Sequence, residues 1–98
     1  MNIAQVAEAL TDVIDPELGI DIVSLGLLYS IEMDDHSFHI KMTMTTPGCP
    51  MATAITQMTA GRLKVLSPER EVHLQVVEDP PWNIGMLNES ARRRLGIR

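Results

Sequence analysis

The segment that most constrains the fold is residues 45–50, TTPGCP, which lie where an alternating apolar pattern ends and a helical pattern begins. Pro47 fixes its own φ and Gly48 can adopt a positive φ, so a tight strand-to-helix turn is predicted. Pro50 suits the first turn of a helix. Cys49, the single cysteine, would then lie at or near the helix N-cap, where free amides and the helix dipole favour a thiolate.

A β-hairpin is predicted before this turn. Phe38, Ile40, Met42 and Met44 alternate with polar residues, which indicates a strand over residues 38–45 with one buried face. Residues 28–33 alternate more weakly and are expected to form another strand. Only the polar stretch 34–37, DDHS, separates the two segments, so an antiparallel pair is predicted.

A helix and a third strand are predicted after the turn. Residues 50–66 show helical periodicity, with an apolar face carried mainly by Met51, Ile55, Met58 and Leu66. Residues 72–76 alternate again and predict a strand. A strand, a helix and a strand in this order favour a crossover between parallel strands.

The two ends of the chain carry clear helix signals. Residues 2–14 predict an amphipathic helix that Asn2 caps and that ends before Pro16. Residues 15–21 are expected to be a structured loop, and residues 22–27 a buried connector. Residues 78–82 contain two prolines and predict a rigid extended segment. Asn88 is expected to cap a last short helix that Gly96 ends.

These elements predict an α+β fold in the order αββαβα. A small mixed three-stranded sheet would pack against helices in a two-layer sandwich. The chain has 98 residues, 45% of them hydrophobic, which suffices for one domain over residues 1–98 with a modest core.

Composition excludes several classes of function. No apolar run approaches the roughly 20 residues of a membrane span, and we expect no signal peptide. A lone cysteine cannot form an internal disulfide, which fits the reducing cytoplasm. The net charge is −5, and the first 35 residues hold eight of the thirteen acidic side chains and no Lys or Arg. This balance argues against nucleic-acid binding.

Cys49 is either a buried structural thiol or a functional one, and three functional roles are open: nucleophile, redox sensor or metal–sulfur ligand. A nucleophile needs a nearby base, and the three histidines, at positions 36, 39 and 73, fall in a turn or on polar strand positions. A closed zinc site needs four ligands, and a cubane cluster needs four cysteines. Two chains could together offer two thiolates, which suggests transient handling of a metal or cluster.

Other polar residues have two readings each. Asp15, Glu17 and Asp21 either cap their own loop or serve as site carboxylates. Thr45 and Thr46 either hydrogen-bond the turn or contact a ligand. Trp82 either fills the core near the end of the third strand or forms a contact for a partner.

Three blocks carry a family resemblance: residues 15–27, DPELGIDIVSLGL, residues 45–50, TTPGCP, and residues 79–82, DPPW. In this order and spacing they resemble the MIP18 family, also called the DUF59 or SufT-like metal–sulfur cluster assembly domain. The resemblance covers nearly the whole chain. Members often continue the third block with Thr-Pro, whereas this chain has Asn83-Ile84-Gly85, so a detailed role of that segment is not carried over.

The resemblance implies a cytoplasmic, non-enzymatic factor that assembles iron–sulfur clusters or delivers them to apo-protein clients together with the iron–sulfur assembly machinery, with a homodimer as one arrangement. Cys49 would bind the cluster transiently, with Asp15, Glu17, Thr45 and Thr46 nearby in one pocket. No Gly-rich phosphate loop is present, so no nucleotide is expected. The alternative is a thiol-dependent enzyme or redox switch in which Asp15 or Glu17 assists Cys49.

Overall fold

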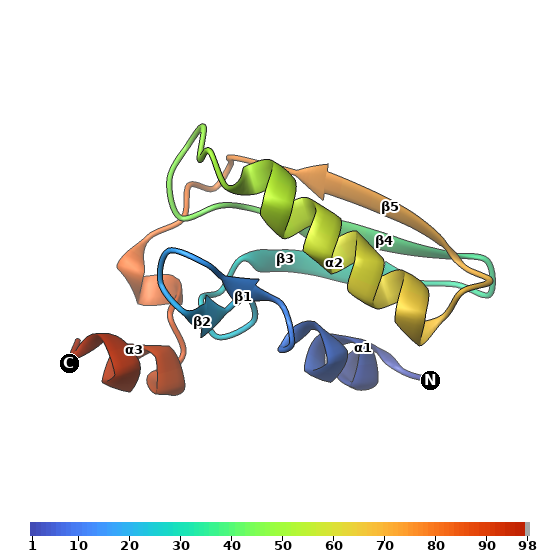
Figure 1. Cartoon of the computed structure of the whole chain (residues 1–98), viewed down its shortest axis with the longest axis horizontal. Coiled ribbons are helices and arrows are strands. Elements are labelled where there is room, and N and C mark those ends of the chain that lie inside the picture. The colour runs from blue at the N-terminus through green and yellow to red at the C-terminus, as the bar shows by residue number, and fades with distance from the viewer. Residues whose placement is uncertain (98) are drawn as a thin grey trace.

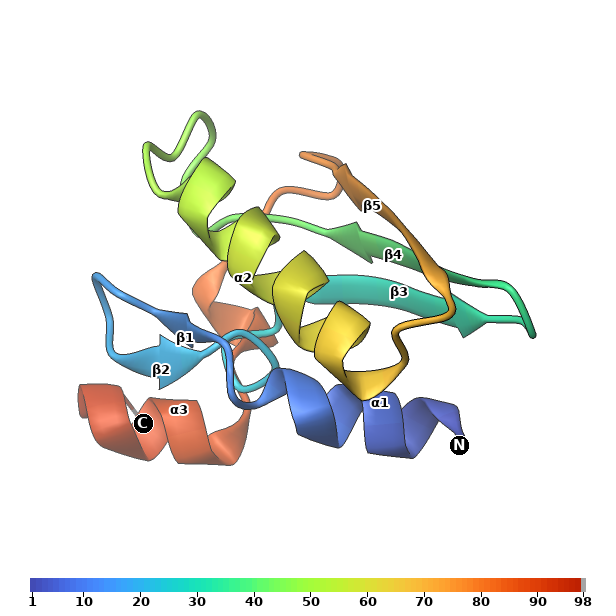
Figure 2. The same cartoon turned by 45° about the vertical axis from the view of Figure 1, so that its right-hand side comes forward.

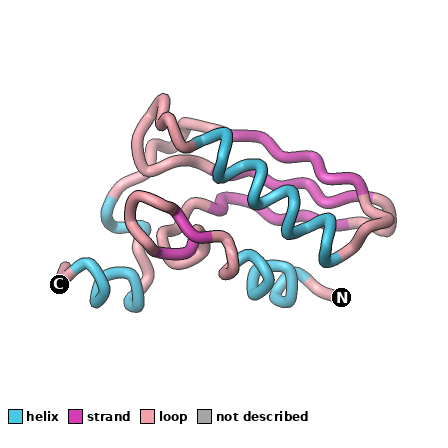
Figure 3. Tube along the Cα trace, in the orientation of Figure 1, coloured by secondary structure: helices cyan, strands magenta, loops and turns pink. Residues whose placement is uncertain are grey.

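The computed structural model describes residues 1–97. Its helices lie on one side of a small sheet and at one end of it (Figures 1 and 3). The elements are α1 (Ile3–Leu10), β1 (Ile14–Asp15), β2 (Ile20–Asp21), β3 (Leu28–Met33), β4 (Ser37–Met42), α2 (Ala52–Leu66), β5 (Glu71–Val76), the 3-10 helix η1 (Ile84–Met86) and α3 (Glu89–Leu95). The predicted order αββαβα is confirmed, with the short β1–β2 pair and η1 in addition.

The main sheet has the strand order β3-β4-β5 and is mixed, as predicted. β3 and β4 pair antiparallel, and β4 and β5 pair parallel with Phe38 opposite Val72 and His39 opposite His73. Phe38, Ile40 and Met42 point into the core because they alternate along β4. α1 and α2 cover that face (Figure 2). The opposite face carries the polar positions, and no helix within residues 1–97 covers it (Figure 2).

α1 begins as predicted but ends earlier. The Asn2 side chain accepts a hydrogen bond from the Gln5 amide, and the Gln5 side chain accepts one from the Asn2 amide, which completes a capping box. The prediction that the helix runs to residue 14 is wrong, because the chain turns after Leu10. Val13 still enters the core from this turn, and Ile14 pairs in β1.

Residues 15–21 form more than a loop, which corrects the prediction. Ile14 pairs with Asp21 and Asp15 with Ile20, so the segment closes as a small antiparallel hairpin. Its turn ends at Gly19, whose φ is 68° and whose amide donates to the Asp15 carbonyl at 2.8 Å. Strands of two residues are too short to show an alternating pattern. Residues 22–27 form the buried connector that was predicted, with Ile22, Leu25 and Leu27 inside.

α2 differs from its prediction at its start and on its buried face. Its N-cap is Met51, which makes no side-chain cap, so Pro50 lies before the helix rather than in its first turn. The buried side chains are Ile55, Thr59 and Leu63, whereas Met58 is 40% exposed. Thr59 tolerates burial because its hydroxyl donates to the Ile55 carbonyl at 2.8 Å.

The C-terminal segment follows its local signals. Asn88 caps α3 by accepting from the Ala91 amide at 2.9 Å, and Gly96 ends the helix with a φ of 72°, both as predicted. α3 lies beside the β1–β2 hairpin in both views (Figures 1 and 2). Within residues 1–97, every helix is too short or too polar to cross a membrane.

Candidate functional site

A cavity of about 130 Å³ lies beside Cys49, at the end of the sheet where β4 and β5 both end. The loop after β4 and the segment after β5 meet at this end (Figure 1). The cavity is lined from three directions. These are Thr43, Met44 and the turn 46–49, then Ala52 of α2, and then Val76 at the end of β5 with Glu78, Pro81 and Trp82 from the segment after it.

The turn that carries Cys49 has the tight geometry that was predicted. Gly48 has a φ of 67°, and the Cys49 amide donates to the Thr46 carbonyl at 3.2 Å. The Cys49 carbonyl accepts from the Ala52 amide at 3.0 Å, so the turn leads directly into α2. Cys49 lies two residues before the N-cap Met51 and is half-buried. Its thiol therefore lines the cavity while remaining within reach of solvent.

Two long-range hydrogen bonds hold the far wall of the cavity. The Trp82 Nε1–H donates to the Leu25 carbonyl at 2.6 Å, and the Tyr29 hydroxyl donates to the Pro80 carbonyl at 2.7 Å. The Val77 amide donates to the Met42 carbonyl at 2.8 Å and extends the parallel pairing beyond β5. Trp82 packs against the core while also lining the cavity. The tertiary fold thus brings the DPPW block against both other blocks.

The acidic residues of the first block are not among the cavity-lining residues. Asp15 is 3% exposed, and its Oδ1 accepts from the amides of Glu17 at 2.8 Å and Leu18 at 3.3 Å. Asp21 accepts from the Ser24 amide at 2.9 Å, and Glu17 is exposed. Of the two threonines, Thr46 lines the cavity and Thr45 does not. Asp15 and Asp21 therefore stabilise their own loops.

Sequence reasoning missed two cavity residues, Thr43 and Glu78. Alternation placed Thr43 on the polar face of a strand over residues 38–45, but β4 ends at Met42 and Thr43 is buried. Glu78 was part of a segment expected only to be rigid and extended. No local signal marks either residue, because both reach the cavity only when the segments after β4 and β5 dock.

Most of the chain matches one family of known proteins. Residues 3–80 match the family described as iron–sulfur cluster assembly protein. The chain belongs to the iron–sulfur cluster assembly protein family. It is 41% identical over 90 residues to the Fe-S protein maturation auxiliary factor YitW of Bacillus subtilis, covering 91% of this chain and 88% of that protein.

Two further likenesses support the family. The Fe-S protein maturation auxiliary factor SufT of Staphylococcus aureus is 40% identical over 86 residues, covering 87% of this chain and 98% of that protein. A solved structure of a DUF59 domain of unknown function from Bacillus anthracis is 42% identical with a TM-score of 0.90. It covers 97% of this chain and 92% of that one. The fold that the resemblance implied is thereby confirmed.

The cavity of this family member is lined by few groups that could bind a metal. The lining offers one thiol, the Glu78 carboxylate and the hydroxyls of Thr43 and Thr46, and among the described lining residues there is no histidine, lysine or arginine. Within residues 1–97 no three His, Cys, Asp or Glu side chains lie together in a way that holds a metal ion. A cubane cluster held by four cysteines needs more thiolates than the single cysteine of this chain offers.

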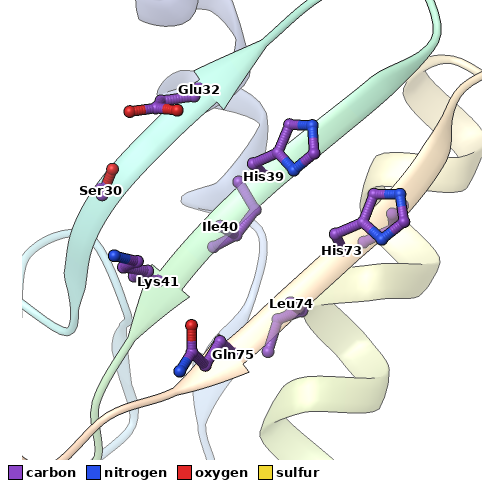
Figure 4. A pocket seen from close by; sticks show the side chains of 9 residues that line it. Ser30, Glu32, His39, Ile40, Lys41, His73, Leu74 and Gln75 are labelled. Carbon is purple, nitrogen blue, oxygen red and sulfur yellow. The ribbon is translucent and has the colours of Figure 1, made fainter.

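The open face of the sheet holds a second, polar groove of about 480 Å³ (Figure 4). His39 and His73 stack there across β4 and β5 with ring centroids 5.0 Å apart. The Nε2 of His39 lies 3.5 Å from Asp34, and the Nε2 of His73 lies 3.2 Å from Glu71. The prediction that these histidines occupy polar strand positions is confirmed. Cys49 is not among the residues that line this groove, and neither histidine lines the cavity beside the thiol.

Proposed function

We propose that this chain is a maturation auxiliary factor for iron–sulfur proteins and that Cys49 is the transient ligand of its metal–sulfur cargo. The supporting observation is the position of Cys49. Its side chain is half-buried and lines a cavity whose opposite wall contains Trp82 and Glu78. The thiol has space beside it for a small species, and no neighbouring histidine among residues 1–97 is placed to use it as a catalytic nucleophile.

Release is as important as binding for such a factor. A single protein sulfur leaves the remaining coordination positions of iron open to sulfide, to an external thiol or to the cysteines of a client protein. The Glu78 carboxylate, which lines the same cavity, supplies a hard oxygen ligand or a favourable negative charge for iron. Iron–sulfur assembly proteins on one side and apo-protein clients on the other are the partners that this chemistry requires.

A homodimer is one way to complete the coordination. Two copies that face each other through their TTPGCP turns would offer two thiolates to one cluster. The cluster would then bridge the copies and leave when a client with more cysteines competes for it. Iron-to-protein stoichiometry distinguishes this arrangement from one cargo per chain.

The proposal is tested by anaerobic reconstitution with iron and sulfide of wild type and Cys49→Ala. We expect wild type to acquire acid-labile sulfide, charge-transfer absorption and a Mössbauer signal, and to pass its iron to an apo-ferredoxin. Cys49→Ala should bind no more iron than a protein-free blank. One cluster per two chains would indicate the homodimer. Equal iron content in both proteins would refute the ligand role of Cys49.

A matched control addresses the acidic loop. The resemblance predicts Asp15 and Glu17 as further site residues, and the alternative enzyme reading needs one of them beside the thiol. Glu17 is exposed and does not line the cavity, so Glu17→Gln should retain iron uptake. Loss of uptake in Glu17→Gln with an unchanged melting temperature would place the acidic loop in the site after all.

A further inference from the structure

Thr43 is a buried residue whose side-chain hydroxyl has no hydrogen-bond partner among residues 1–97. Three hydroxyl-bearing side chains in this part of the chain are at most 3% exposed: Thr43, Thr59 and Ser67. Thr59 donates to the Ile55 carbonyl and Ser67 donates to the Glu69 carboxylate, each at 2.8 Å. The Thr43 amide donates to the Leu27 carbonyl at 2.8 Å, whereas the hydroxyl makes no hydrogen bond to any described residue. Burying a hydroxyl without a partner is costly, so its position needs an explanation.

The cavity beside Cys49 provides that explanation. Among the described residues, every side-chain nitrogen or oxygen that is fully shielded from solvent has a hydrogen-bond partner. The Thr43 hydroxyl has none, so a small opening must leave part of its surface accessible. Thr43 lines the cavity that also contains Cys49, and we therefore place the opening there. With the opening placed there, the hydroxyl is a hydrogen-bond donor at the wall of the space where cargo on Cys49 would lie.

The other polar side chains of the cavity are less suited to this role than Thr43. The Trp82 N–H is already committed to the Leu25 carbonyl. The Glu78 carboxylate is an acceptor only, and Thr46 is exposed, so water satisfies its hydroxyl. The rest of the wall is mainly apolar, with Met44 and Pro81 among its residues. A buried donor in apolar surroundings makes a stronger hydrogen bond than the same donor in water.

We infer that Thr43 positions the metal–sulfur cargo by donating a hydrogen bond from its hydroxyl to a sulfur atom of the species held on Cys49. This inference rests on the proposed function of Cys49. A hydrogen bond to sulfur stabilises the more negatively charged, reduced state of an iron–sulfur species, and such bonds are one of the factors that set its reduction potential. Thr43 is thus a positioning residue, and Cys49 remains the ligand.

The test compares reconstituted wild type with Thr43→Val, which removes the hydroxyl and keeps the shape. Thr43→Val should initially bind the same amount of iron as wild type but release it several-fold faster to a chelator. Its bound iron–sulfur species should have a lower reduction potential. Part of the change in Fe–S stretching frequencies between H₂O and D₂O, seen by resonance Raman, should disappear. Thr43→Ser should restore all three properties. Should the valine variant not fold, Thr43→Ala serves for the same comparison.

Thr59→Val is the matched control, since it removes a buried hydroxyl that is paired with the Ile55 carbonyl outside the cavity. It should lower stability without changing the potential or the isotope effect. If Thr43→Val changes these properties no more than Thr59→Val while Cys49→Ala loses its iron, the role of Thr43 is overturned and that of Cys49 stands. If wild type and Cys49→Ala take up equal iron, both proposals fall together.

Discussion

Gly26 lies between β2 and β3 with a φ of 75°, and a Cβ atom there would overlap the carbonyl oxygen of Met86. This close approach lets η1 and the segment before it dock onto the connector of residues 22–27. The Asn88 amide, two residues after η1, donates to the Ser24 carbonyl at 2.9 Å and attaches the chain after η1 to the same connector. At this position only glycine satisfies both the backbone angle and the contact.

Gly26→Ala should therefore lower the free energy of unfolding by about 3 kcal/mol or more, through backbone strain and a steric clash. Urea unfolding followed by circular dichroism measures the change. Gly61→Ala is the control, because Gly61 lies inside α2. Apart from its chain neighbours and the backbone of its own helix, a Cβ there would meet no atom within 4 Å, so the change should stabilise the fold by up to about 1 kcal/mol. Equal stability of Gly26→Ala and wild type would mean that the close approach to Met86 is absent in solution.

The β3–β4 hairpin shows how one side chain specifies an element. The Asp34 Oδ1 accepts from the amides of His36 at 2.8 Å and Ser37 at 2.7 Å, and its Oδ2 lies 3.5 Å from His39. The hydrogen bond from the His36 amide is the main cause that lowers the pKa of Asp34 below its ordinary value of 3.8, and the Ser37 amide and His39 act in the same direction. The turn thus favours the charged carboxylate.

A lowered pKa makes the stabilising effect of Asp34 dependent on pH. The contribution is present above the unfolded-state value of 3.8 and is lost as the pH falls through the lower folded-state pKa. At pH 7 the melting temperature of Asp34→Asn should be lower than that of wild type. The difference in melting temperature should shrink as the pH falls and vanish below the folded-state pKa of Asp34. Thermal melts from pH 7 to strongly acid conditions measure it.

Asp35→Asn controls for the loss of one negative charge from the same turn. Asp35 is exposed, and its carboxylate makes no hydrogen bond to any described residue. The melting temperature of Asp35→Asn should lie closer to that of wild type than the melting temperature of Asp34→Asn does, and the difference should vary less with pH. A constant gap between Asp34→Asn and wild type at every pH would contradict the assignment of the effect to the charged Asp34 carboxylate.

Across the whole molecule, the segment of residues 77–82 connects the sheet to the other two blocks of the family resemblance. Hydrogen bonds from Tyr29 to the Pro80 carbonyl and from Trp82 to the Leu25 carbonyl attach it, and they join residues that are 51 and 57 positions apart. Because Pro81 and Trp82 form one wall of the cavity, we expect these bonds to affect access to Cys49.

Tyr29→Phe removes the hydroxyl and keeps the ring, so it should cost about 1 kcal/mol of stability. It should also speed the alkylation of Cys49 by iodoacetamide under native conditions, since the wall formed by Pro81 and Trp82 is held less firmly. Combining Tyr29→Phe with Trp82→Phe in a double-mutant cycle measures how far the two attachments depend on each other. An alkylation rate that stays at the wild-type value in both single variants would show that this segment does not govern access to the thiol.

The sequence by itself determined the local features of this protein. Proline, glycine and capping residues act within a few positions, so they predicted the Cys49 turn and the caps at Asn2 and Asn88. Periodicity predicted β3, β4, α2 and β5, since alternation and helical spacing follow from backbone geometry alone. Short elements such as β1, β2 and η1 were not predicted, because two or three residues are too few to show a period.

Only the tertiary structure decided which side chains surround Cys49. It brought in Thr43, Glu78 and Trp82 from segments that meet at one end of the sheet, and it engaged Asp15 in its own hairpin. It also ended α1 at Leu10 and turned Met58 toward solvent. These outcomes depend on how separate segments dock, through contacts between residues far apart in the chain. Local sequence patterns carry no information about such contacts, because their energy exists only once both partners are in place.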